Sequence, residues 1–128
     1  MYSASIGGSR LKGERQMLLI WSANLKEGMD IPYKKWAMKN IGEMKRRIPK
    51  GWKLVGGYGA AMNLGPRDVV WIWEFNRYKD MDDLFDLVDP VLDKMSAEEN
   101  KFLLPGSIRS MILRNITDWY EPVTKKSK

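Results

Sequence analysis

Two stretches of the chain alternate as β-strands do, yet they are apolar on both sides. Residues 69–77 read Val-Val-Trp-Ile-Trp-Glu-Phe-Asn-Arg, and residues 16–25 read Gln-Met-Leu-Leu-Ile-Trp-Ser-Ala-Asn-Leu. Successive side chains of a strand point to opposite faces, so each stretch presents two bulky faces. We therefore expect helices to cover one face of each strand and a different structural element, such as a second sheet, to cover the other. We expect Trp71 and Trp73 to face the helices, with Val70, Ile72 and Glu74 on the other side.

Apolar residues at helical spacing predict a helix over residues 30–48, with Asp30 as its N-cap and Pro32 in its first turn. A second, acidic helical pattern covers residues 80–95. Pro90 lies inside that pattern and is expected to kink or split the helix, because proline removes a donor and clashes with the preceding turn. Residues 96–99 read Ser-Ala-Glu-Glu, which resembles a capping box and predicts a short further helix to residue 103.

The remaining strands are expected at residues 52–62 and 107–116, with a hairpin loop at residues 63–68. Glycines at 56, 57 and 59 predict a bulged or closely approached strand. The order is then βαββαβ. It predicts an α+β, ferredoxin-like fold, in which a four-stranded antiparallel sheet carries its helices on one face. We expect a flexible arm at residues 1–15, one domain at 16–121, in which Trp119 and Tyr120 close the edge of the core, and a basic tail at 122–128.

The apolar second face of the sheet predicts self-association. An antiparallel sheet with helices on one face only is normally polar on the other. Because strands one and three are apolar on both faces, the simplest way to bury the second face is to pack it against the same face of a second copy. The sequence thus favours a homodimer or a higher homo-oligomer. The alternative is that one of the terminal segments folds over that face.

Composition removes several kinds of chemistry. The 128 residues contain no Cys and no His, which excludes disulfides, thiolate nucleophiles, Ser-His-Asp triads, His- or Cys-ligated haem and the usual zinc sites. We expect neither a metal nor a cofactor. No apolar run approaches the ~18 residues of a membrane span and no signal peptide is apparent, so we expect a soluble cytoplasmic protein that does not bind membranes.

The net charge of +6 is unevenly distributed. Residues 26–53 hold nine Lys or Arg against three Asp or Glu, whereas residues 79–99 hold two against eight. The two segments therefore carry +6 and −6, and their fields would partly cancel if they form neighbouring helices. Nucleic acid is consequently an unlikely partner.

The strand order, the strand-one ending Trp21-Ser22-Ala23-Asn24 and the strand-three run Trp71-Ile72-Trp73-Glu74-Phe75 resemble the dimeric α+β barrel superfamily. This group includes the antibiotic-biosynthesis monooxygenases, the haem-degrading monooxygenases and the NIPSNAP-like proteins, and the Leu87-Val88-Asp89-Pro90 break resembles the NIPSNAP-like pattern. In the haem-degrading members the site combines an Asn late in strand one, a Trp in strand three and a His in the second helix. Asn24 and Trp73 (or Trp71) match the first two, and the third has no counterpart. The resemblance implies a pocket between helices and sheet, without haem chemistry.

Large aromatic and amide side chains make up the candidate ligand-binding site. Aromatic rings would line a pocket for a flat or apolar molecule, although each ring also suits plain core packing. Asparagines aimed at an apolar interior would orient a ligand or stabilise an anion, although each could equally bind local backbone. The candidate set is Asn24, Tyr33, Trp36, Asn40, Trp71 and Trp73.

Three functions follow from this pattern. The first is a dimeric protein that binds a small apolar or aromatic molecule, with cofactor-independent monooxygenation or isomerisation as its chemistry. The second is a non-catalytic assembly protein. The third is a single-stranded nucleic-acid binder related to RRM domains, which share the element order and would stack bases on exposed Trp71 and Trp73. The third-strand stretch lacks the glycines and leading basic residue of the RRM motif.

Overall fold

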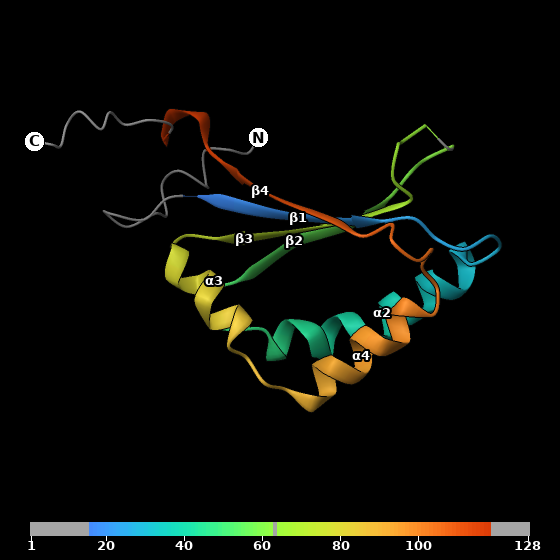
Figure 1. Ribbon diagram of the computed structural model, residues 1–128, viewed down its shortest axis with the longest axis horizontal. Helices are drawn as coiled ribbons and strands as arrows, with labels where there is room; N and C mark the ends of the chain where they lie inside the picture. The colour runs from blue at the N-terminus through green and yellow to red at the C-terminus, as the bar shows by residue number, and fades with distance from the viewer. Residues whose placement is uncertain (1–15, 63, 119–128) are drawn as a thin grey trace, which may run out of the picture.

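The computed structural model describes residues 16–62 and 64–118 and has the predicted α+β, ferredoxin-like architecture. Its sheet has the order β2-β3-β1-β4, with every neighbouring pair antiparallel. The helices lie on one face of this sheet (Figure 1). The predicted arm at 1–15, Trp119, Tyr120 and the tail at 122–128 lie outside the described residues. The elements are β1 (Met17–Ala23), α2 (Asp30–Arg47), β2 (Lys53–Gly59), β3 (Val69–Phe75), α3 (Tyr78–Phe85), α4 (Pro90–Asn100), β4 (Arg109–Arg114) and a 3-10 turn (Ile116–Asp118).

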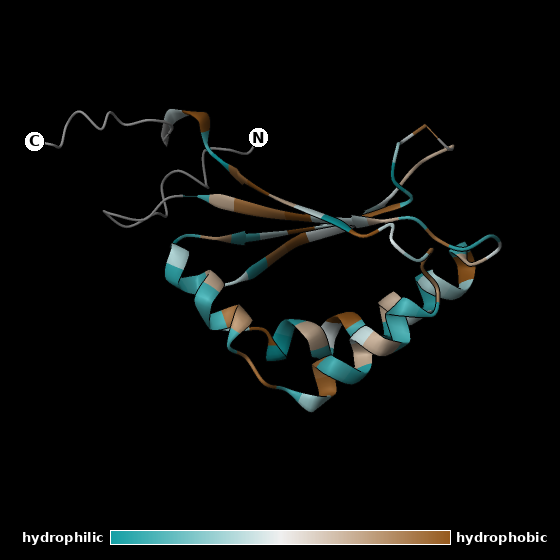
Figure 2. Cartoon of the chain, viewed as in Figure 1, coloured by the Kyte–Doolittle hydropathy of each residue, from teal (hydrophilic) through white to brown (hydrophobic). Residues whose placement is uncertain are grey.

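The predicted facing of the central strands is confirmed. Along β3 the odd-numbered side chains are buried and the even-numbered ones are half-buried. The buried set packs against α2 and the other helices, so Trp71 and Trp73 face the helix side, as expected. Figure 2 shows brown, apolar stretches along β1 and β4 of the sheet. The helix-side core comprises Met17, Ala23, Tyr33, Trp36, Trp52, Val69, Trp71, Trp73, Phe75, Met95 and Leu103.

The start of α2 corrects the predicted cap. Helix α2 begins at Asp30, and Met29 occupies the N-cap position without a side-chain cap. The carbonyl of Met29 already accepts the first helical hydrogen bond, from the amide of Tyr33 at 2.9 Å. Asp30 is therefore one residue inside the helix, where its charge still suits the positive end of the helix dipole. Pro32 lies in the first turn, as predicted.

The acidic segment is divided by Pro90, but the helices fall elsewhere than predicted. Helix α3 ends at Phe85, and α4 runs without interruption from Pro90 to Asn100. The carboxylate of Asp89 caps α4 by accepting from the amides of Val91 and Leu92. Proline at the first helical position loses no hydrogen bond, so Pro90 starts a helix instead of kinking one. The separate helix predicted from Ser96 was wrong, because residues 96–100 continue α4.

The outer strands are shorter than the sequence pattern indicated. Strand β2 ends at Gly59 instead of residue 62, and its register against β3 shifts between Leu54 and Gly56, which confirms the predicted bulge. Strand β1 ends at Ala23, after which Leu25 makes an isolated bridge with Leu103. Strand β4 covers six residues, and Ser107 before it caps the end of β1 through hydrogen bonds between its hydroxyl and the backbone of Asn24.

Candidate functional site

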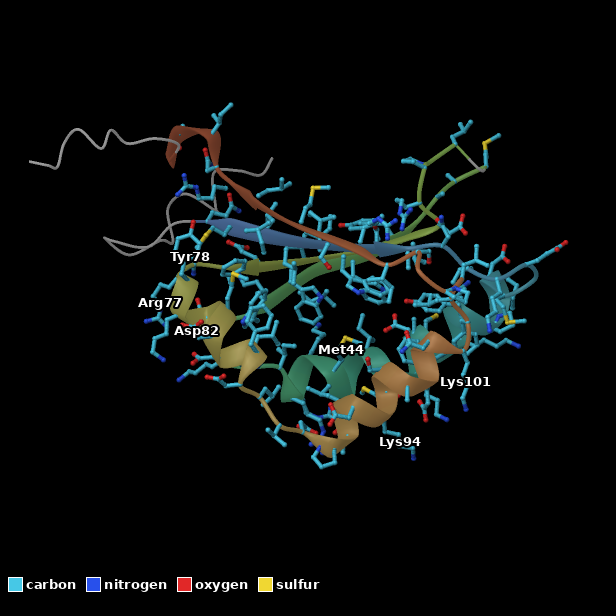
Figure 3. All side chains as sticks on the ribbon, in the orientation of Figure 1. Met44, Arg77, Tyr78, Asp82, Lys94 and Lys101 are labelled. Atoms are coloured by element: carbon cyan, nitrogen blue, oxygen red, sulfur yellow. The ribbon has the colours of Figure 1, made fainter. Side chains whose placement is uncertain are left out.

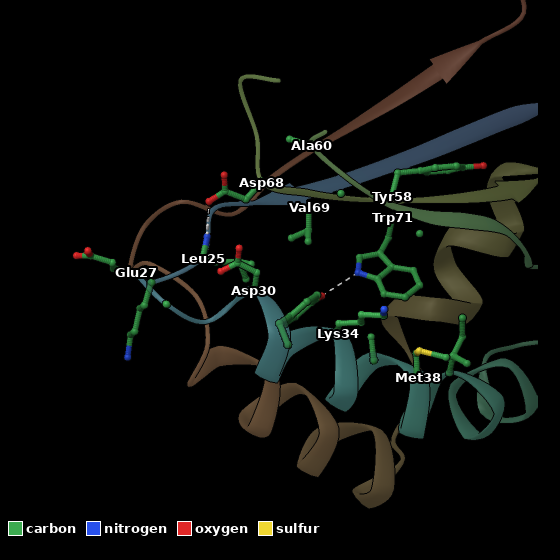
Figure 4. Close-up of a pocket in the computed structure, with 17 residues that line it drawn as sticks. Leu25, Glu27, Asp30, Lys34, Met38, Tyr58, Ala60, Asp68, Val69 and Trp71 are labelled. Atoms are coloured by element: carbon green, nitrogen blue, oxygen red, sulfur yellow. Dashed lines mark hydrogen bonds between the residues drawn. The ribbon is translucent and has the colours of Figure 1, made fainter. Parts of the chain in front are cut away.

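A cleft of about 750 Å³ opens between the N-terminal half of α2 and the β2–β3 side of the sheet (Figure 4). It lies at an edge of the molecule, because β2 is an outer strand. Binding sites for small molecules are commonly clefts of about 300–1,000 Å³. The lining residues come from the 25–30 loop, the first three turns of α2, the end of β2 and the start of β3. The most informative of them are Tyr33, Lys34, Ala37, Met38, Gly57 and Trp71.

Trp71 reaches the cleft because Gly57 lies beside it. The two residues are paired in the β2–β3 register and share the helix-side face. A Cβ atom on Gly57 would lie 2.5 Å from Cζ3 of the Trp71 ring, a distance that real structures do not tolerate. Glycine at 57 therefore allows the indole to lie flat against the backbone of β2, and it keeps the ring in the wall of the cleft.

Behind the cleft wall, a chain of hydrogen bonds joins three elements. The indole Nε1–H of Trp71 on β3 donates to Oη of Tyr33 on α2 at 2.9 Å. The Tyr33 hydroxyl donates in turn to Oε2 of Glu99 on α4 at 2.6 Å. Figure 4 shows the first of these bonds at the inner end of the cleft. Each polar atom of the chain thus has a partner, as burial requires.

The surroundings of this chain shift the pKa of both ionisable members upward. Burial, followed by the nearby Glu99 carboxylate, raises the pKa of the Tyr33 phenol far above its ordinary value. Burial also raises the pKa of Glu99, against the opposing effect of the hydrogen bond from Tyr33. Tyr33 therefore keeps its proton near neutral pH. It can donate a hydrogen bond but cannot serve as a base.

The mouth of the cleft is polar and of mixed charge. Lys26 and Lys34 lie there together with the carboxylates of Glu27, Asp30 and Asp68. Asp68 is held in place from two sides, because its Oδ2 accepts from the amide of Leu25 at 2.8 Å and its own amide donates to Asn24 Oδ1 at 2.9 Å. The apolar wall and the charged rim together would favour a ligand with an apolar body and a polar end.

Of the six predicted site residues, Tyr33 and Trp71 line the cleft. Trp36 packs in the core toward α4, where its Nε1–H donates to Glu98 at 3.1 Å. Trp73 lies deeper along β3, in the cluster that contains Trp52 and Phe75. Neither Trp36 nor Trp73 is among the lining residues of this cleft.

Both predicted asparagines make hydrogen bonds with the backbone. Asn24 accepts from the amide of Asp68 and thereby joins the end of β1 to the start of β3. Asn40 Nδ2 donates to the carbonyl of Trp36, one turn earlier in α2, at 2.8 Å. These bonds match the local backbone alternative considered from the sequence, and the two side chains lie outside the lining of the cleft.

Several contributors to the site were missed in the sequence. Lys34 and Met38 were not among the predicted site residues, yet both line the cleft, and their four-residue spacing places them on the same side of α2. Glu99 had been interpreted as part of a helix cap. The sequence offered one indication of the role of Glu99. A carboxylate on the inward face of an amphipathic helix requires a hydrogen-bond donor inside the protein.

Two further types of site were searched for among residues 16–62 and 64–118. These residues hold no cluster of three or more carboxylates that would coordinate a metal ion. None of their helices combines the length and apolar character needed to cross a bilayer.

Comparison with solved structures places this fold among known proteins. A NIPSNAP family protein with unknown function from Agrobacterium tumefaciens strain C58 aligns with a TM-score of 0.63 at 20% identity, over 80% of this chain and 90% of that one. A second NIPSNAP family protein from the same strain aligns with a TM-score of 0.68 at 15% identity, over 86% and 93% of the two chains. The chain has a NIPSNAP-like fold.

An uncharacterised NIPSNAP-like domain protein from Burkholderia xenovorans gives a TM-score of 0.63 at 14% identity, over 81% of this chain and 88% of that one. No protein-family model and no curated protein sequence matches the chain. At these identities the likeness to NIPSNAP-like structures concerns the fold, which agrees with the resemblance noted in the sequence.

Proposed function

We propose that the protein is a homodimer in which each subunit binds a small apolar or aromatic molecule in the cleft between α2 and the β2–β3 side of the sheet. The observation that carries the binding proposal is the cleft itself, about 750 Å³ in volume, with Trp71 held in its wall by the hydrogen bond to Tyr33 and with a polar rim at its mouth. Apolar burial supplies affinity for such a ligand, and a few fixed polar groups orient it.

The protonation of Tyr33 favours binding over proton abstraction by this residue. The carboxylates of Asp30 and Asp68 lie in the same cleft and are the groups that would accept a proton from a bound ligand. Cofactor-independent monooxygenation or isomerisation is therefore the catalytic form of this proposal. The non-catalytic form is ligand binding or assembly alone.

The open face of the sheet supports the dimer. Side chains on that face of β1, β3 and β4 lie directly opposite one another in the strand register, for example Leu18 beside Leu113 and Ile20 beside Met111 and Ile72. Met111 and Leu113 are exposed. Because a monomeric antiparallel sheet would present a polar face here, burial against a second copy is the natural cover. Each side chain so buried would contribute about 1.5–3 kcal/mol before the cost of association.

The nucleic-acid alternative required Trp71 and Trp73 to be available for base stacking. Both rings face the helices and are 9% and 8% exposed. On the open face, β3 presents Val70, Ile72 and Glu74 instead. RRM-like stacking on the third strand therefore has no exposed ring on which to act.

Titration with a fluorescent aromatic probe such as 1-anilinonaphthalene-8-sulfonate tests the ligand site. We expect saturable binding that is lost in Ala37→Phe, because the new ring would fill the cleft between α2 and Trp71. Ala97→Phe, on the exposed surface of α4, makes the same substitution as a control and should bind normally. A folded wild-type protein that binds no aromatic probe would leave assembly as the function.

A further inference from the structure

One side of α2 carries a dense set of cations. Helical spacing over residues 34–46 places five basic side chains on the surface that faces away from the core. Arg46 is bonded to Glu43 at the flank of this surface. The five residues are Lys34, Lys35, Lys39, Lys45 and Arg46, and we call the surface they form the basic face.

Two large apolar side chains lie within the basic face. Ile31 is 60% exposed and Met38 is 69% exposed. They are seven residues apart, so they lie on the same line along the helix. A helix with exposed apolar side chains framed by lysines has the pattern of a segment that lies in the interface of a membrane.

The basic face is continuous with the ligand cleft. Lys34 and Met38 belong to both, since they are exposed on α2 and also line the cleft. A partner that binds the basic face would therefore also contact the mouth of the cleft. Three carboxylates border the basic face: Glu27 and Asp30 lie at the N-terminal end of the helix, and Glu43 pairs with Arg46 and Arg47 toward its C-terminal end.

We propose that the basic face of α2 docks on an anionic lipid surface, with Ile31 and Met38 entering the interfacial layer and the lysines contacting lipid phosphates. This proposal departs from the expectation from the sequence that the protein has no membrane partner. The docking itself does not depend on the proposed function. A further consequence, that an apolar ligand passes directly between lipid and cleft, does rest on it.

Charge and exposure together favour lipid over nucleic acid. Both partners would attract the lysines, but only a bilayer accepts exposed aliphatic side chains. Single-stranded nucleic acid would instead require rings for stacking, and the aromatic residues of α2, Tyr33 and Trp36, are both buried.

Co-sedimentation of the full chain with lipid vesicles, without added ligand, tests the proposal. We expect binding to vesicles containing about one-third phosphatidylglycerol, no binding to pure phosphatidylcholine, and release by high salt. Lys35→Gln combined with Lys39→Gln should weaken binding about 25-fold, because each cation contributes roughly fivefold. Ile31→Ser combined with Met38→Ser should weaken it roughly tenfold.

Matched controls use exposed residues of the same kinds elsewhere. Lys94→Gln combined with Lys101→Gln removes the same charge from α4 and the residue that follows it, where both lysines point away from the sheet (Figure 3). Val88→Ser removes an 85% exposed apolar side chain between α3 and α4. Both controls should bind vesicles as the wild type does.

Three results would overturn the proposal: absence of vesicle binding by the folded protein, equal effects of test and control variants, or salt-sensitive binding to single-stranded RNA that Ile31→Ser and Met38→Ser leave unchanged. No ligand is added in these experiments, so none of the three results decides whether the cleft binds an aromatic probe. The titration described above tests that separately.

Discussion

The indole N–H of Trp71 donates to the hydroxyl of Tyr33 at 2.9 Å, and this bond joins the centre of the sheet to the helix that covers it. The Tyr33 hydroxyl in turn donates a hydrogen bond to Glu99, so α4 is attached to the same point. The wall of the cleft is thus fixed by polar contacts as well as by packing.

Tyr33→Phe should destabilise the protein while leaving the shape of the cleft intact. The substitution deprives the buried Trp71 N–H and the Glu99 carboxylate of their partner, which costs about 1–3 kcal/mol for each group left unsatisfied. Urea unfolding followed by tryptophan fluorescence would show the loss as a lower midpoint. Tyr58→Phe, which removes a hydroxyl from a 53% exposed ring, is the control and should change little.

Glu99→Gln should alter the pH dependence of stability. The folded-state pKa of Glu99 is raised, so the folded protein holds this proton more tightly than the unfolded chain does. Protonation of Glu99 therefore stabilises the folded state relative to the unfolded chain. This stabilisation is fully present below the ordinary pKa of 4.5 and is lost as the pH rises through the folded-state pKa.

The free energy of unfolding of the wild type should therefore fall relative to that of Glu99→Gln as the pH rises from 4.5 toward neutrality. Urea unfolding at a series of pH values measures the difference. A difference that does not vary with pH would contradict the assigned burial of Glu99.

Gly57→Ala should displace the Trp71 ring. The new methyl group would lie 2.5 Å from the indole, and the buried ring has little room to move. Overpacking of this kind costs about 1–3 kcal/mol. Gly59→Ala is the control two residues along the same strand, where the nearest atom lies at 3.6 Å. Denaturation midpoints of the two variants should differ clearly, and equal midpoints would show that Trp71 yields at no cost.

Met111→Glu combined with Leu113→Glu should convert the proposed dimer to a monomer. The two charges would lie on the open face of the outer strand β4, beside Ile20 and Leu18 of β1, and would lose their hydration if a second copy covers that face. Light scattering coupled to size exclusion gives the mass. Phe85→Glu, at a 72% exposed position on α3, should leave the mass unchanged. A monomeric wild type would reject the dimer outright.

The residues that decided the fold in advance were those with a strict spacing. Alternation through residues 69–75 gave the correct facing of Trp71 and Trp73, because a strand has a period of two whatever its neighbours are. The glycines at 56 and 57 correctly indicated a bulge. Pro90 marked a boundary, but it could either kink one helix or begin a second one. The outcome depended on whether Asp89 would cap a new helix, and the local sequence does not decide between the two.

The site was predicted less completely, for a physical reason. The sequence shows that Tyr33, Trp36, Trp71 and Trp73 face inward, but it does not show which rings meet other side chains and which meet empty space. Trp36 and Trp73 are enclosed by neighbours, whereas Gly57 makes room for the Trp71 ring and both residues line the cleft. Glu99 is separated from Tyr33 by 66 positions, so their contact arises only from the packing of α4 on α2.

The strand order also governs how the chain is assembled as it is synthesised. Strand β1 occupies an inner position of the sheet, with Met17 paired to both Phe75 and Arg114. It leaves the ribosome first, yet both of its neighbours are made much later. The β2–β3 hairpin can form locally in the meantime, whereas the Met-Leu-Leu-Ile-Trp run of β1 must wait unpaired. An apolar strand in that condition is prone to aggregate until β3 and β4 have been synthesised and can pair with it.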